Sequence, residues 1–322
     1  MNKLLLACWI ILSVFSLHAQ KPASISATVK GYNGKVVDFE FMNQDGINMQ
    51  FPYREGQEMS FESKLNGINL IKVNAYVWIC VRPGDQIHAD IRYDGRNYQT
   101  AEFSGTPEMV IANNVVRDMR NYRIANQYKM NPLAAIVTQV PMMDYYKGTQ
   151  VELENELRML EAKKQEIPAD VYNYLYAEHQ SLLLSNLILC PEMFAGRGAE
   201  KQLTYPEGYW NILDRYTLSE DKNTLKSRAY MDFLLTYKKY MQTKTAHEKG
   251  VEYVRNVTMK EEYDDITTFY TGILRENALF VFLYNQMTGG RDFAMIEPLA
   301  KDYLKNYAKN KYFKKTLTDM MQ

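Results

Sequence analysis

Few residues of this 322-residue chain have the types and spacing of a catalytic site. Glu178 and His179 are adjacent in an apolar helical segment and could act as an acid–base pair. Neighbouring side chains on a helix point about 100° apart, so these two do not converge on one atom. We therefore interpret His179 as a histidine at the boundary of the core.

A run of acidic residues at 261–265 (Glu-Glu-Tyr-Asp-Asp) is the second candidate site. Calcium loops have spaced oxygen ligands around a glycine turn, and this run has neither. Acidic side chains stabilise the first turn of a helix because they interact favourably with its dipole. The run therefore predicts the start of a helix.

Sequence motifs of common enzyme classes are missing from the chain. It contains no Gly-x-Ser-x-Gly, His-Glu-x-x-His or Cys-x-x-Cys pattern and no glycine-rich phosphate or dinucleotide fingerprint. We therefore predict no catalytic residue, no cofactor and no metal site. This pattern favours a protein that is not an enzyme and leaves the question of activity open.

Aromatic residues are abundant, with 25 Tyr, 13 Phe and 3 Trp. Three of them, Tyr205, Tyr209 and Trp210, lie at a predicted loop-to-helix junction, where exposed rings can recognise a ligand. We identify them as the candidate contact to a ligand or partner. The alternative is that a tryptophan at the start of a helix packs in the core.

The first residues predict export. Lys3 precedes an apolar run too short to span a bilayer, and Ala19 precedes polar Gln20. We expect a signal peptide at residues 1–19, a mature chain that starts at Gln20, and a location in the periplasm of a Gram-negative cell. The less favoured alternative is a lipoprotein anchored at Cys8, because Leu-Leu-Ala-Cys at 5–8 resembles a lipobox.

Two cysteines remain after removal of the signal peptide. Cys80 lies in the apolar run 76–81 and Cys190 ends another, so each is expected to be a small buried hydrophobic residue. A disulfide between them is the alternative, because exported proteins commonly form such bonds.

The overall charge is balanced, with 38 Lys and Arg against 38 Asp and Glu. This balance argues against nucleic acid as a partner, and a mean hydropathy of −0.40 argues against a polytopic membrane protein. We expect no transmembrane segment after signal cleavage. Six lysines interleaved with aromatic residues at 301–322 predict an amphipathic terminal helix, with contact to an acidic lipid or partner as a second option.

Two halves follow the signal peptide. Residues 20–106 alternate short β-rich runs with turn residues, which predicts an antiparallel β-sandwich or barrel. The expected strands are 24–30, 36–42, 49–53, 58–64, 70–73, 76–81, 86–93 and 99–103. Asp85, in the Pro-Gly-Asp turn at 83–85, is expected to bond the backbone of that turn.

Residues 107–322 have the periodicity of an all-α domain, so the chain as a whole is predicted to be α+β. Acidic residues of the segment 151–165, among them Glu152 and Glu156, are expected on a solvated helix face. The expected helices are 108–128, 133–146, 150–165, 169–189, 208–216, 227–241, 245–257, 264–287 and 293–307.

Two short motifs suggest a family. Segment 80–87 (Cys-Val-Arg-Pro-Gly-Asp-Gln-Ile) joins one strand to the next, and segment 101–106 (Ala-Glu-Phe-Ser-Gly-Thr) leads into the helices. With the order of signal, β-domain and helices, they resemble the accessory region before the thioredoxin domain of exported TlpA-type thiol:disulfide oxidoreductases. The family's Trp-Cys-x-x-Cys centre is absent here, and Gln322 falls about where that domain would begin. No catalytic residue of the family can therefore be transferred.

Two functions follow from these observations. The first is an exported envelope module that binds an envelope protein or small ligand and has no catalytic centre. The second is the recognition part of a thiol:disulfide oxidoreductase whose thioredoxin domain is missing, split or supplied in trans by a thioredoxin-like partner.

Overall fold

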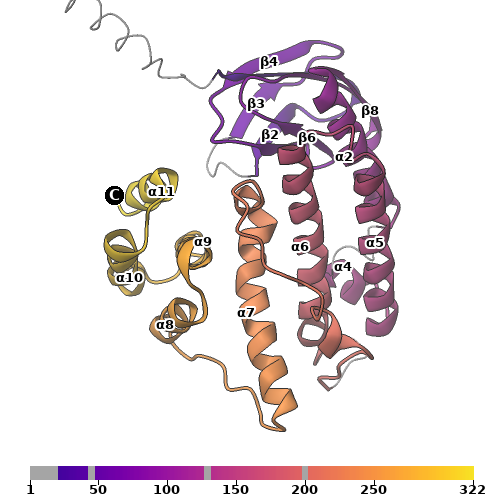
Figure 1. The fold of residues 1–322 in the computed structure, drawn as a ribbon. Helices are drawn as coiled ribbons and strands as arrows, with labels where there is room; N and C mark the ends of the chain where they lie inside the picture. Colours follow the sequence, from indigo (N-terminus) through magenta and orange to yellow (C-terminus); the bar gives the residue numbers. More distant parts are fainter. Residues whose placement is uncertain (1–20, 43–47, 127–131, 198–201) are drawn as a thin grey trace, which may run out of the picture.

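A computed structural model describes residues 21–42, 48–126, 132–197 and 202–322. The expected signal peptide and Cys8 lie outside the described residues. A β-region comes first in the chain and helices follow it (Figure 1). Its strands are β1 (Ala23–Tyr32), β2 (Val36–Phe41), β3 (Asn48–Pro52), β4 (Glu58–Ser63), β5 (Asn69–Val73), β6 (Val77–Val81), β7 (Gln86–Gly95) and β8 (Asn97–Gly105).

The strands form two four-stranded sheets, in the orders β4-β1-β7-β8 and β3-β2-β5-β6. Phe39 of β2 and Phe61 of β4 meet between the sheets, with ring centroids 5.2 Å apart. Their contact shows that the sheets enclose a common core. The α+β class and all eight expected strands are confirmed, with one difference: β1 and β7 pair in parallel.

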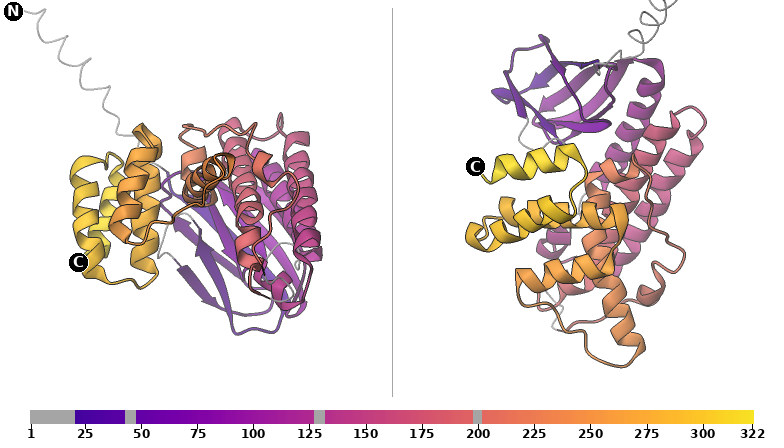
Figure 2. Two further views of the ribbon diagram at one scale, coloured as in Figure 1. Left: turned by 90° about the horizontal axis from the view of Figure 1, so that it is seen from below. Right: turned by 60° about the vertical axis from the view of Figure 1, so that its left-hand side comes forward.

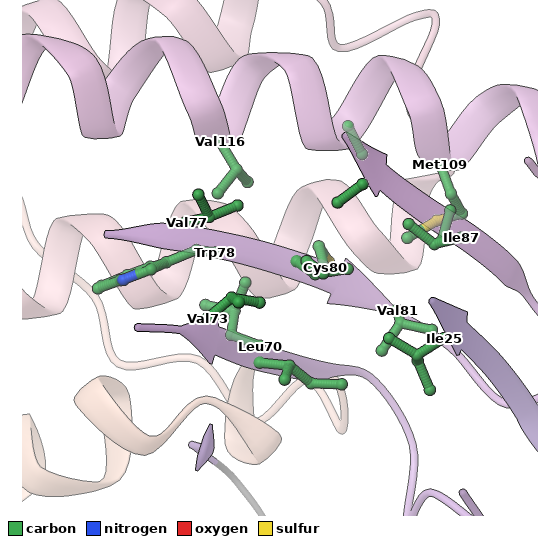
Figure 3. Packing of buried hydrophobic residues seen from close by; sticks show 14 of the residues in the cluster. Ile25, Leu70, Val73, Val77, Trp78, Cys80, Val81, Ile87, Met109 and Val116 are labelled. Carbon is green, nitrogen blue, oxygen red and sulfur yellow. The ribbon is translucent and has the colours of Figure 1, made fainter. Parts of the chain in front are cut away.

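Strand β6 is buried along its whole length although it lies at the edge of its sheet. The first helix of the helical region, α2 (Pro107–Ala125), covers it, and Figure 3 shows Val116 of this helix directed toward Val77. The side-chain amide of Asn113 accepts a hydrogen bond from the Cys80 N–H (2.7 Å) and donates one to the Cys80 carbonyl (2.9 Å). Asn113 therefore satisfies edge groups that would otherwise be unpaired in the core.

The turn between β6 and β7 is held as the sequence predicts. Gly84 has a φ of +85°, and a carboxylate oxygen of Asp85 accepts the Arg82 N–H at 2.7 Å. The Arg82 guanidinium also pairs with Glu108 of α2 (3.1 Å). The turn consequently fixes the start of the helical region.

Figures 1 and 2 show α5, α6 and α7 side by side, with the C-terminal helices grouped beyond α7. None of the described helices is long and apolar enough to cross a membrane. After α2, the described helices are α4 (Pro132–Val137), α5 (Met142–Ala162), α6 (Ala169–Phe194), the 3-10 turns η1 (Tyr209–Asn211) and η2 (Thr224–Lys226), α7 (Arg228–Glu248), α8 (Met259–Phe269), α9 (Gly272–Thr288), α10 (Phe293–Asn306) and α11 (Lys311–Met320).

Several expected helix bounds are wrong. The expected helix 208–216 is only the single turn η1, and residues 251–257 are not helical. The expected helix 264–287 is two helices, because the chain becomes extended at Tyr270 and Thr271. The expected helices 133–146 and 150–165 divide at a different place. Pro141 directly precedes α5, where proline costs no helical hydrogen bond, and α5 then continues through Gly148.

The hydrophobic core does not stop at residue 106. One buried cluster contains Ile25 and Phe39 of the sheets together with Met109 of α2 and Leu175 of α6. The division into domains at 20–106 and 107–322 stays a prediction. Cys80 and Cys190 are both buried, as expected, and no disulfide joins them.

Candidate binding site

The predicted contact residues lie in the connection between α6 and α7. Gly208 has a φ of +75°, which suits glycine, and reverses the chain so that the Tyr209 N–H donates to the Pro206 carbonyl (3.1 Å). The single turn η1 then begins, so Tyr209 and Trp210 follow each other on a tight curve and point in different directions.

Tyr209 is an anchor of this connection. It is buried, and its hydroxyl donates to the Ile188 carbonyl of α6 at 2.8 Å. Its own carbonyl accepts the Tyr240 hydroxyl of α7 at 3.0 Å. Burial raises the pKa of the Tyr209 phenol above its ordinary value. Tyr209 therefore ties η1 to both long helices and is not free to contact a ligand.

The rings of Trp210 and Tyr205 both contact the Tyr209 ring, each with centroids 4.9 Å from it. The Trp210 ring stacks on His247 of α7, with centroids 4.2 Å apart and planes 11° apart. The Tyr205 ring lies 4.6 Å from Trp210 and is 37% exposed. Within the described part of the chain, the indole N–H of Trp210 has no hydrogen-bond acceptor.

These rings line a cavity of about 280 Å³, which we call the aromatic cleft. Glu192 of α6 forms part of its wall, accepts a hydrogen bond from Lys239 (2.5 Å) and forms an ion pair with Arg255 (2.9 Å). Its charge is consequently balanced within the protein. The lining residues are Glu192, Leu203, Tyr205, Trp210, Thr243, His247, Val251, Glu252, Tyr253 and Arg255.

An apolar segment borders the aromatic cleft after α7. Val251, Val254 and Val257 are 58%, 82% and 90% exposed, in a stretch without regular structure. Val251 lines the cleft, and Val254 and Val257 follow it in the same exposed segment, so apolar surface continues along the chain from the cavity. Of the three residues identified from the sequence, Tyr205 and Trp210 line the cleft and Tyr209 supports it from below.

A second cluster, which the sequence did not reveal, is buried between the long helices. Arg123 of α2 donates two hydrogen bonds to Glu156 of α5, and His179 of α6 lies 2.8 Å from Glu156 and 3.0 Å from Arg123. The interpretation of His179 as a boundary residue is wrong, because only 1% of it is exposed. We call Arg123, Glu156 and His179 the buried ion cluster.

The solvated face expected for α5 is also wrong at two positions, since Glu152 and Glu156 are both buried. Burial raises the pKa of Glu156, but attraction to Arg123 and hydrogen bonds from Arg123 and His179 outweigh it and lower the pKa to about 2. Glu156 is therefore ionised at neutral pH. In the sequence, the spacing of four residues between Glu152 and Glu156 places both on one helix face, and this was the only indication that they share an environment.

Glu178 does not act with His179. Its carboxylate accepts hydrogen bonds from the Ser227 hydroxyl (2.7 Å) and the Ala229 N–H (3.2 Å) at the start of α7. This geometry agrees with the expectation that adjacent side chains on a helix diverge. Glu178 positions α7, whereas His179 belongs to the buried ion cluster.

The acidic run 261–265 starts α8, as predicted. Glu261 and Thr258 form a capping box, and Glu262 and Asp265 both pair with buried Lys238 of α7. Across the described ranges, no group of three or more His, Cys, Asp or Glu residues could hold a metal ion.

Comparison of the chain with protein-family models, with curated proteins and with solved structures finds no match.

Proposed function

We propose that the chain is an exported module of the cell envelope that binds a partner and has no catalytic centre of its own. The observation that carries this proposal is the aromatic cleft, which is lined by the exposed Tyr205 and the partly buried Trp210 beside the buried anchor Tyr209. A rigid base with accessible rings suits binding, because little conformational freedom is lost on contact.

The chemistry of the cleft favours an extended protein segment as the partner. Apolar side chains of such a segment would pack against Tyr205 and Val251, and a backbone carbonyl would accept the Trp210 N–H. Aromatic rings with a polar group are enriched where proteins recognise each other. Export to the periplasm rests on residues 1–19, and amino-terminal sequencing should find Gln20 first; a lipid adduct on Cys8 would contradict this.

The second candidate function is recognition on behalf of a thioredoxin-like protein supplied in trans. This candidate rests on the resemblance of segments 80–87 and 101–106; burial raises the pKa of the Cys80 thiol, so this thiol is unsuited to exchange. Cys190 is buried as well. Any exchange chemistry would then belong to the partner.

Site-specific photo-crosslinking in cells that export the protein tests both functions. A Tyr205→benzoylphenylalanine variant should give a discrete covalent adduct, which mass spectrometry identifies. Tyr76, which is 41% exposed on the β-region, is the matched control position and should not give this adduct. A partner with Trp-Cys-x-x-Cys would favour the second function over the first.

The adduct should also depend on the cleft. A Trp210→Ala change in the Tyr205 variant removes the N–H donor and should abolish crosslinking, provided that its far-UV spectrum is unchanged. No adduct at position 205, or the same adducts at 205 and 76, would contradict binding at the aromatic cleft.

A further inference from the structure

A second cavity, of about 380 Å³, lies where the β-region meets the C-terminal helices. In Figures 1 and 2, α11 is the C-terminal helix nearest to the β-region. The loop before β5, η2, α7, α9 and the α10–α11 connection all contribute to this junction cavity. Its lining residues are Asn66, Ile68, Lys222, Leu225, Lys226, Met231, Ile273, Glu276, Asn277, Lys309, Asn310, Tyr312 and Phe313.

The lining of the junction cavity is mainly apolar. Ile68, Leu225, Met231 and Phe313 come from four separate segments of the fold and are each at most 7% exposed, while Ile273 is 39% exposed. The volume lies within the roughly 300–1,000 Å³ of small-molecule sites. An apolar ligand of that size would bury most of its surface here.

Positive charge dominates the polar part of the lining. Lys222, Lys226 and Lys309 face one acidic residue, Glu276. The Glu276 carboxylate is already engaged, since it accepts the N–H groups of Lys309 and Asn310, both at 2.5 Å. The lining of the cavity therefore carries more positive than negative charge.

Lys226 is the cation best placed for a ligand. It is half-buried, and its ammonium has no ion pair or hydrogen bond within the described ranges. Burial and the neighbouring Lys222 lower its pKa, against the attraction of Asp170 and Asp221. Partial burial removes part of the hydration of the Lys226 ammonium, and an anion bound beside it would replace that hydration with an ion pair.

Lys226 also lines an adjoining, more polar cavity together with Arg82, Asp85 and Asp170. There Arg82 is paired with Asp85 (3.2 Å), with Asp170 (3.7 Å) and, outside the cavity, with Glu108. A charged ligand group at Lys226 could thus stay partly hydrated in the adjoining polar cavity, while an apolar chain attached to it enters the junction cavity.

We propose that the junction cavity binds a free medium-chain carboxylic acid, with its alkyl chain among Ile68, Leu225, Met231 and Phe313 and its carboxylate at Lys226 and Lys222. The acid would contact the β-region and α11 at once and so stabilise their association. This site is separate from the aromatic cleft and does not depend on its role.

Calorimetric titration of the mature chain with octanoate, decanoate and dodecanoate tests the proposal. We expect saturable binding of one acid per chain, with affinity rising about fourfold for each added methylene until the cavity is filled. Decanol, which has no charge, should bind at least tenfold more weakly than decanoate, because it lacks the ion pair with Lys226.

Variants separate the charged and the apolar contributions. Lys226→Met keeps the length of the side chain and should weaken decanoate at least tenfold but leave decanol unchanged. Lys314→Met, at an exposed position of α11 that does not line the cavity, alters the net charge equally and should change the binding of neither ligand. Ile273→Trp, at an exposed position, should obstruct the cavity and weaken both ligands.

Three results would overturn the proposal: no saturation with any acid, equal weakening by Lys226→Met and Lys314→Met, or affinity independent of chain length. Trp210→Ala is expected to leave decanoate binding intact. Failure of crosslinking at the aromatic cleft and failure of acid binding are therefore distinguishable.

Discussion

The buried ion cluster is the strongest polar feature at the level of single residues. Arg123, Glu156 and His179 come from three helices, and each is at most 1% exposed. Taking charges out of water is costly, so a buried pair adds little net stability compared with apolar residues. Removing one member, however, leaves the remaining buried charge with weaker compensation, because Glu152 lies 3.7 Å from Arg123 and does not replace the contacts of Glu156. The cluster therefore specifies how α2, α5 and α6 pack.

Glu156→Gln should destabilise the protein by about 3 kcal/mol, because Arg123 loses its hydrogen-bonded carboxylate and keeps only the more distant Glu152, at 3.7 Å. Urea unfolding followed by far-UV circular dichroism measures this change. Glu154→Gln, at an exposed position of the same helix, is the matched control and should change stability by less than about 0.5 kcal/mol. Equal effects of the two changes would show that the cluster does not constrain packing.

The lowered pKa of Glu156 predicts that the stability of the fold depends on pH. The folded-state pKa of Glu156 is about 2, below its ordinary value of 4.5, so its ionisation stabilises the fold fully above the unfolded value. That contribution is lost as pH falls from about 4.5 toward 2. The stability difference between the wild-type chain and Glu156→Gln should thus shrink over this range, as measured by unfolding at successive pH values. A stability difference that stays constant between pH 4.5 and 2 would show that the pKa of Glu156 is not lowered in the folded state.

The sequence could not reveal the buried ion cluster, because hydrophobic periodicity indicates which face of a helix is apolar but not which residue of another helix a side chain contacts. Glu152 and Glu156 look like members of a solvated face, since glutamate is usually exposed. Their burial depends on Arg123, which arrives from another helix. The turn that carries Tyr205 and Trp210 could be located from the sequence because Pro206 and Gly208 interrupt regular structure, and their contact with a ligand stays a prediction. The anchoring of Tyr209 could not be predicted, because it depends on Ile188 and Tyr240 of two other helices.

At the level of elements, strands were more predictable than helices. Turn residues such as those at Gly84 limit the backbone locally, so all eight strands could be located. The break at Tyr270, by contrast, has only one local signal, Gly272 (φ +56°), and this glycine lies two residues after it. Tyr270 leaves the helical conformation there, and its buried hydroxyl donates to the Leu234 carbonyl of α7 at 2.6 Å. Long-range contacts of this kind cannot be deduced from local residue preferences.

Asn113→Leu should destabilise the protein by about 2 kcal/mol or more, because the N–H and carbonyl of Cys80 would stay buried without partners. Hydrogen exchange at the Cys80 amide should become faster, and urea unfolding should begin at a lower concentration. Asn114→Leu, one position along the same helix, serves as the control and should leave exchange at Cys80 unchanged. Protection of Cys80 that survives Asn113→Leu would mean that packing alone covers the edge of β6.

At the scale of the whole molecule, α2 connects the two halves. The expected boundary at residue 106 follows the change of periodicity, but Met109 and Val116 of α2 belong to the same buried cluster as the sheets. A fragment that ends at 106 would expose β6, with Val77 and Trp78 on its faces and the Cys80 backbone at its edge. Exposed apolar edges of this kind favour aggregation over folding.

We therefore expect residues 20–126 to fold more stably than residues 20–106. The longer fragment retains Asn113 at the edge of β6 and should give a β-rich far-UV spectrum with additional helix and a cooperative thermal transition. The shorter fragment should melt at a lower temperature or without cooperativity, since about 85 residues with an uncovered strand bury too little apolar surface. Purified fragments, compared at equal concentration by circular dichroism, provide the measurement. Equal melting of the two would place the boundary at residue 106 and assign α2 to the helical domain, because the sheets would then need no helix to complete their core.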